Sequence, residues 1–180
     1  MFCNQCEQTR KGSGCTTAGV CGKPPEVAAL QDLLTYALRG LSQVAIAARH
    51  AGISDAKVDR FTSRALFSTL TNVNFDASRF QTLILEAVFR RDQLEEKLVA
   101  AGGAVSTQDP AVSFRPAPDM VGLVRQGVGV RLPIDWEADE DIRSLQEITL
   151  YGLRGLAAYA DHAAIPVSYT HLTLPTILRV

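Results

Sequence analysis

LQDLLTYALRGL, residues 30–41, is the stretch of sequence from which the fold can be predicted. LQEITLYGLRGL, residues 145–156, repeats it at an offset of 115 with seven of twelve positions identical. In both copies apolar residues recur at intervals of three and four, the pattern of a helix with one buried face. Because solenoid repeats have periods of about 20–50 residues, so long an offset indicates a duplicated helical unit. The sequence therefore predicts two related helical units.

The sequence around the first copy predicts three consecutive helices. Their expected ranges are about 26–51, 55–70 and 76–102, with Ser54 or Asp55 and then Asp76 as N-caps. Glycines at positions 52, 102 and 103 are expected to end the first and third helices. Short turns between consecutive helices favour an antiparallel bundle, which we assign to residues 26–103.

The rest of the chain divides into three expected segments. Residues 104–137 are rich in proline and glycine and are interpreted as a connector with one short helix near 120–126, anchored to a bundle by Trp136. Residues 138–165 are expected to start the second bundle. Residues 166–180 abandon the helical pattern and resemble a translated sequencing adapter, so we assign them as a non-native tail. Gly40 and Gly155, inside the two repeated helices, are expected to permit close helix approach.

The predicted fold class is therefore all-α, with two three-helix-bundle-like units, the second incomplete, preceded by a cysteine-rich loop at residues 1–25. The chain has 18 basic and 19 acidic side chains, so its composition favours neither nucleic acid nor an anionic membrane as a partner. The sequence contains no uninterrupted run of about 20 apolar residues, so it predicts no membrane span. The first residues lack the pattern of a secretion signal, and we expect a cytoplasmic protein.

All four cysteines lie at the start of the chain, at Cys3, Cys6, Cys15 and Cys21, with the spacing C-x2-C-x8-C-x5-C. Four thiolates without histidine are the usual ligands of a [4Fe–4S] or [2Fe–2S] cluster. Two disulfides are an alternative, but that arrangement is typical of small secreted domains. A structural zinc ion is a second alternative, although zinc ribbons usually have two C-x2-C pairs and this chain has one. We assign the four cysteines as cofactor and metal ligands.

Other residues near the cysteines could support such a site. Glycines at positions 12, 14, 19 and 22 are expected to take positive φ and bring backbone N–H groups toward the sulfurs. Arg10, Lys11 and Lys23 could offset the charge of a thiolate-bound cluster or could simply lie on the solvated surface. His50 and His162 are expected at helix carboxy ends, where the helix dipole favours a cation. The chain contains no nucleotide-binding motif or catalytic triad, and we predict no catalytic residue in it.

Three segments carry a resemblance to a known family. They are MFCNQCEQT at 1–9 with Cys15, Cys21, Gly22-Lys23 and LQDLL at 30–34; FSTLTNVNFD at 67–76; and LYGLRG at 150–155 through His162. Residues 1 to about 165 resemble the amino-terminal part of hybrid cluster proteins, the prismane or hydroxylamine reductase family.

The resemblance implies two metal centres in a full-length protein. The first would be held by the four cysteines, and the short gaps between them are similar to the [4Fe–4S] subgroup, whereas longer gaps accompany [2Fe–2S]. The second, a hybrid iron–sulfur–oxygen cluster in the carboxy-terminal portion, would reduce hydroxylamine to ammonia and water, or nitric oxide to nitrous oxide. The amino-terminal domain would consist of two three-helix bundles.

The resemblance implies that the cysteine, histidine, glutamate and lysine ligands of the second centre come from the longer carboxy-terminal portion, and this chain has no cysteine after position 21. We therefore expect an electron-transferring fragment that accepts electrons from a soluble donor and does not by itself reduce hydroxylamine. The alternative is a zinc-stapled helical interaction module without a redox role. Carbon monoxide dehydrogenases have a related architecture, but their amino-terminal cysteine pattern differs.

Overall fold

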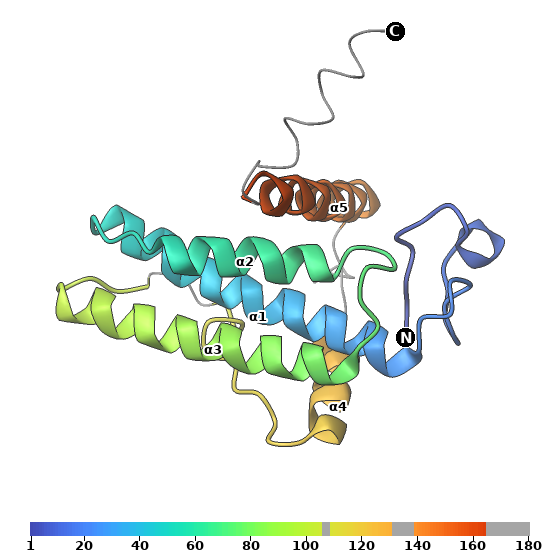
Figure 1. Ribbon diagram of the computed structural model, residues 1–180, viewed down its shortest axis with the longest axis horizontal. Helices are drawn as coiled ribbons and strands as arrows, with labels where there is room; N and C mark the ends of the chain where they lie inside the picture. Colours follow the sequence, from blue (N-terminus) through green and yellow to red (C-terminus); the bar gives the residue numbers. More distant parts are fainter. Residues whose placement is uncertain (106–108, 131–138, 165–180) are drawn as a thin grey trace, which may run out of the picture.

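The computed structural model of the chain describes residues 1–105, 109–130 and 139–164, and for Arg10 only the backbone. The described residues contain five α-helices and no strand: α1 (Pro25–His50), α2 (Ala56–Ser68), α3 (Ala77–Ala100), α4 (Met120–Val130) and α5 (Glu140–Ala163). This confirms the all-α prediction. The cysteine-rich loop lies at one end of the helical assembly, at the start of α1 (Figure 1).

The centre of the structure is α1, which packs against α2, α3 and α4. Pro25 begins this helix, where a missing N–H costs nothing, and Glu26 follows in the first turn, near the positive end of the helix dipole. Its apolar stripe is almost wholly buried and includes Leu30, Leu33, Leu34, Leu41 and Val44. These side chains form one core with apolar residues of α2 and α3.

The caps of α2 and α3 lie where the sequence places them. The Asp55 carboxylate accepts hydrogen bonds from the N–H groups of Lys57 at 3.0 Å and Val58 at 3.3 Å. Asp76 does the same for Ser78 at 2.9 Å and Arg79 at 3.1 Å. Asp55 therefore caps α2, and the prediction of both caps is confirmed. Positive φ angles at Gly52 and Gly102 follow the ends of α1 and α3, also as predicted.

The short helix expected in the connector, α4, packs closely on α1. Leu123 is fully buried, and a Cβ on Gly127 would fall inside the contact distance of the Ala29 carbonyl. Gly40 allows a similar approach between α1 and the Ala111 carbonyl, as its sequence context predicts. The described part of the expected connector, residues 109–130, therefore packs around α1. Trp136 and the expected tail at 166–180 lie outside the described residues.

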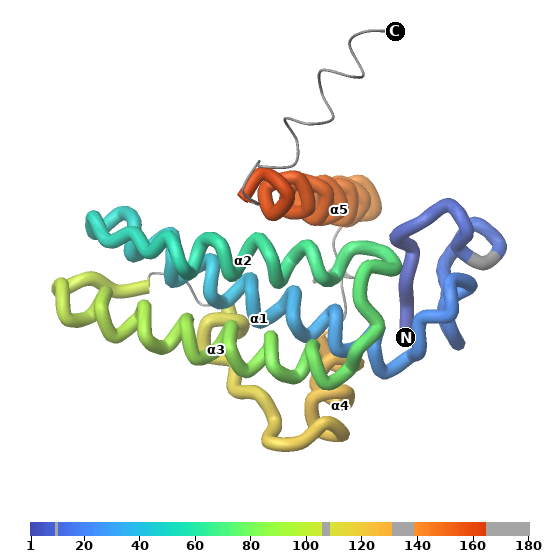
Figure 2. The backbone as a smooth tube through the Cα atoms, in the orientation of Figure 1, coloured from blue at the N-terminus to red at the C-terminus, as the bar shows by residue number. Residues whose placement is uncertain are grey.

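The second copy of the repeat forms α5, which packs against α2 (Figures 1 and 2). Arg64 of α2 forms an ion pair with Asp161 at 3.0 Å, and the rings of Phe67 and His162 meet edge to face at 5.8 Å. The expected close approach at Gly155 is not met in the described part of the chain, where nothing lies within 4 Å of the position of a Cβ.

Many apolar side chains of α5 are exposed in the described structure, among them Leu145, Ile148, Leu153 and Leu156. This explains why Gly155 differs from Gly40, since no second element covers that face within the described residues. Among the described residues, no helix has both the length and the hydropathy that a bilayer crossing requires.

Candidate metal centre

The cysteine loop folds back on itself at Cys3 and Cys15. The backbone N–H of Cys3 donates to the Cys15 carbonyl at 3.0 Å, and the Cys15 N–H donates to the Cys3 carbonyl at 2.8 Å. Cys15 is 5% exposed, whereas Cys3, Cys6 and Cys21 are half-buried. None of the four forms a disulfide. The fold therefore brings the first and third cysteines together by pairing their backbones.

Glycines shape this loop in two different ways. Gly12, Gly14 and Gly22 have φ angles of 72°, 152° and 86°, which confirms the prediction of positive φ at these positions. The same prediction is wrong for Gly19, which takes no positive φ. A Cβ at Gly19 would lie 3.1 Å from Cys21 Sγ and 2.9 Å from Lys23 Cβ, so glycine is needed there for close packing beside a thiol.

Lys23 is the cation that the loop directs inward. It is 1% exposed, and its Nζ donates to Gln31 Oε1 at 2.7 Å and lies 3.9 Å from Cys3 Sγ. The surface interpretation of Lys23 is therefore wrong, because the ammonium is held between an amide oxygen and a sulfur. Lys11 is exposed, in agreement with a surface role.

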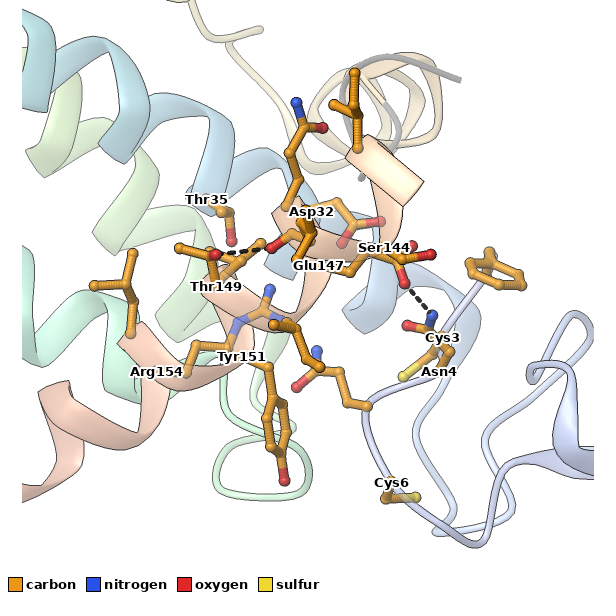
Figure 3. Close-up of a pocket in the computed structure, with 18 of the residues that line it drawn as sticks. Cys3, Asn4, Cys6, Asp32, Thr35, Ser144, Glu147, Thr149, Tyr151 and Arg154 are labelled. Atoms are coloured by element: carbon orange, nitrogen blue, oxygen red, sulfur yellow. Dashed lines mark hydrogen bonds between the residues drawn. The ribbon is translucent and has the colours of Figure 1, made fainter. Parts of the chain in front are cut away.

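Helix α5 contributes two polar side chains to the surroundings of the loop. Glu147 Oε2 accepts a hydrogen bond of 2.7 Å from Asn4 Nδ2 (Figure 3). Asn4 follows Cys3 directly in the sequence. Arg154 is 5% exposed, and its Nε donates to Thr69 Oγ1 at 3.0 Å. Between the loop, α1 and α5 lies an open cavity of about 1290 Å³, whose lining includes Cys3, Cys6, Asp32, Glu147 and Arg154.

Two ionisable groups in this cavity are perturbed by their surroundings. Burial raises the pKa of Asp32 to about 7, although the positive charges of Arg154, Lys23 and the amino terminus act in the opposite direction. Burial also lowers the pKa of Arg154, opposed by the negative charges of Asp32 and Cys3. Asp32 therefore interacts with both Arg154 and Lys23, and each of these two cations also interacts with Cys3.

The thiols do not surround one point in the described structure. No group of three or more His, Cys, Asp or Glu side chains among the described residues is arranged as the ligands of a single metal ion. The donor set itself fits an iron–sulfur cluster, since four thiols lie in one glycine-rich loop and a buried ammonium is directed at one of them. Cys3, Cys6, Cys15 and Cys21 would be the ligands.

Sequence reasoning missed Gln31, Asp32, Glu147 and Arg154 as neighbours of the loop. The internal repeat contained a signal, because at the offset of 115 Asp32 corresponds to Glu147 and Arg39 to Arg154. Arg39 pairs with Asp109 in the segment before α4, whereas Arg154 faces Thr69 and Asp32. The same repeat position therefore has different partners in α1 and α5.

Comparison with known proteins shows the family of this chain. The sequence profile of the Prismane/CO dehydrogenase family matches residues 1–174. The chain belongs to the Prismane/CO dehydrogenase family. Membership of this family supports the iron–sulfur interpretation of the four cysteines and confirms the resemblance seen in the sequence.

Individual members of this family are similar to the chain over most of its length. A hydroxylamine reductase of Methanocella arvoryzae is 57% identical over 166 residues, which are 92% of this chain and 31% of that protein. Hydroxylamine reductases of Syntrophobacter fumaroxidans and Solidesulfovibrio magneticus are 56% and 51% identical, again over 92% of this chain and 30% of each relative. The chain thus spans about 30% of the length of these relatives.

Proposed function

We propose that this chain is the amino-terminal, electron-transferring portion of a hydroxylamine reductase. Its cofactor would be a [4Fe–4S] cluster held by Cys3, Cys6, Cys15 and Cys21, and the alternative nuclearity is [2Fe–2S]. The observation that carries the proposal is the arrangement of four thiols in one loop with the buried Lys23 ammonium beside Cys3. The similarity to hydroxylamine reductases supports the reaction class.

The chain's own residues would hold and orient the ligands. Backbone pairing between Cys3 and Cys15 fixes two of the thiols relative to each other, and Gly19 allows the chain to pass close to Cys21. Asn4, bound to Glu147, ties the segment between Cys3 and Cys6 to α5. When bound, the cluster would supply reversible one-electron transfer. The loop thus provides sulfur ligands and a nearby cation, and no group in it acts as a nucleophile.

The exposed edge of the loop supports a role in accepting electrons. Asn4, Glu7 and Gln8 are exposed around Cys6, so this side of the site is open to an approaching protein. We propose a soluble electron donor as the partner and the cytoplasm as the location. Reduction of hydroxylamine to ammonia and water, and of nitric oxide as a further activity, would take place at a hybrid iron–sulfur–oxygen cluster. That cluster would lie in the remaining part of the longer protein.

Anaerobic expression followed by analysis for iron, acid-labile sulfide and zinc tests this proposal. We expect a brown protein with broad visible absorption and an EPR signal after reduction. Cys15→Ser should abolish most iron binding, because Cys15 is buried and its backbone is hydrogen-bonded to that of Cys3. Thr17→Ala, at an exposed position of the same loop, should leave iron binding unchanged. A colourless chain with one zinc per molecule would contradict the proposal and support a zinc-stapled helical module.

A further inference from the structure

Lys23 is buried at the junction of the cysteine loop and α1. Its ammonium donates to Gln31 Oε1 at 2.7 Å, and Gln31 Nε2 in turn donates to the Asn74 carbonyl at 3.2 Å. Lys23 and Gln31 are each 1% exposed. The amide of Gln31 therefore has a fixed orientation, with its oxygen toward Lys23, and it holds the ammonium 3.9 Å from Cys3 Sγ.

A buried ammonium is stable only where negative charge compensates it, because moving a charge out of water costs several kcal/mol. The Asp32 carboxyl interacts with Lys23, with Arg154 and with the amino terminus. One carboxyl thus faces three positive groups. Two of these positive groups, Lys23 and Arg154, also interact with Cys3.

Such surroundings suit a site that becomes more negative during function. An iron–sulfur cluster bound by four thiolates is anionic and gains one further negative charge on reduction, and nearby charges and hydrogen bonds to sulfur set its potential. A cation near a ligand sulfur favours the reduced state, and in a poorly hydrated environment the effect is only weakly screened. Lys11, exposed in the same loop, lacks these properties.

We propose that Lys23, oriented by Gln31, is a positioning residue that raises the reduction potential of the amino-terminal cluster through Cys3. The inference rests on the proposed function and extends it to a specific residue outside the ligand set. Reduction adds one electron from the donor to the cluster, and Lys23 acts through its position beside Cys3. Its role is to make electron uptake by the cluster more favourable.

The test compares the reduction potentials of the anaerobically loaded wild-type chain and its variants by spectroelectrochemistry. Lys23→Met should lower the affinity for the electron at least tenfold, which is a shift of about 59 mV to more negative potential for a one-electron couple. Lys23→Arg, which keeps the charge, should restore most of the wild-type value. Lys11→Met removes a charge from the same loop at an exposed position and should leave the potential unchanged.

A second variant covers the case in which Lys23→Met fails to fold or to bind iron. Gln31→Glu keeps the size and the acceptor oxygen of the side chain but places a negative charge against the ammonium, so it should also shift the potential to more negative values. Circular dichroism and iron content identify the variants that fold and load. A wild-type potential in loaded Lys23→Met or Gln31→Glu would overturn this inference alone. Absence of iron and sulfide from the wild-type chain would overturn the proposed function.

Discussion

The substitution Gly40→Ala tests the close packing of the first copy of the repeat, in α1. In α1 a Cβ at this position would fall inside the contact distance of the Ala111 carbonyl oxygen. That carbonyl is also held from the other side, because it accepts hydrogen bonds from Arg91 Nη1 at 3.3 Å and from the Phe114 N–H at 3.4 Å. The new methyl group can therefore be accommodated only by moving the segment that contains Ala111 away from α1.

The magnitude follows from two opposing terms. Replacing a helical glycine with alanine stabilises a helix by about 1 kcal/mol. Overpacking against a fixed neighbour costs about 1–3 kcal/mol. Gly40→Ala should therefore lower the free energy of unfolding by up to about 2 kcal/mol. Gly155→Ala, at the same repeat position in α5, meets nothing within 4 Å among the described residues and should raise it by up to about 1 kcal/mol.

Urea unfolding followed by circular dichroism at 222 nm measures both variants against the parent chain. The two substitutions are chemically identical, so the comparison removes the helix-propensity term and leaves the packing term, about 1–3 kcal/mol. Equal stabilisation by both variants would refute the close approach at Gly40. Equal destabilisation would show that α5 is as closely packed as α1.

Three further predictions follow from buried polar groups and from the length of the chain. Folding raises the Asp32 pKa from 3.8 to about 7, so the folded state holds this proton more tightly than the unfolded state does. The resulting contribution to the free energy of unfolding is fully present below pH 3.8 and is lost as the pH rises through about 7. Asp32→Asn should therefore flatten the profile of urea stability against pH in this range, by at most about 4 kcal/mol; an unchanged profile would contradict the shift. Arg91→Met should lower stability by about 2–4 kcal/mol, because it leaves the carbonyls of Ala111 and Phe114 without this donor, whereas exposed Arg115→Met should cost under about 1 kcal/mol. The loaded chain alone should form no more ammonia from hydroxylamine than free iron and sulfide do, and turnover above that control would mean that the catalytic centre is within these residues.

The positions of the helices could be predicted from the sequence because local physics determines them. Apolar spacing, the caps Asp55 and Asp76, and the glycines at 52 and 102 act within a few residues of one another, and the structure confirms each of them. The assignment of the four cysteines as a ligand set rests on their type and spacing, and it stays a prediction.

The contacts between distant segments could not be predicted in this way. The burial of Lys23 depends on Gln31 and on the turn that supplies the Asn74 carbonyl, 43 residues after Gln31. Arg154 lies near the loop only because α5 packs on α2, and the packing of α4 on α1 depends on Gly127 facing a backbone carbonyl. A lysine in a glycine-rich loop is usually exposed, and composition gives no sign that this one is an exception.

The mass of the intact chain measured by native mass spectrometry under anaerobic conditions tests the central claim most directly. We predict a species heavier than the polypeptide by four iron and four sulfide ions, with no such species in a variant that lacks Cys15. A chain that carries one zinc ion, or one that has lost four hydrogens to two disulfides, would contradict the assignment of the four thiols to an iron–sulfur cluster.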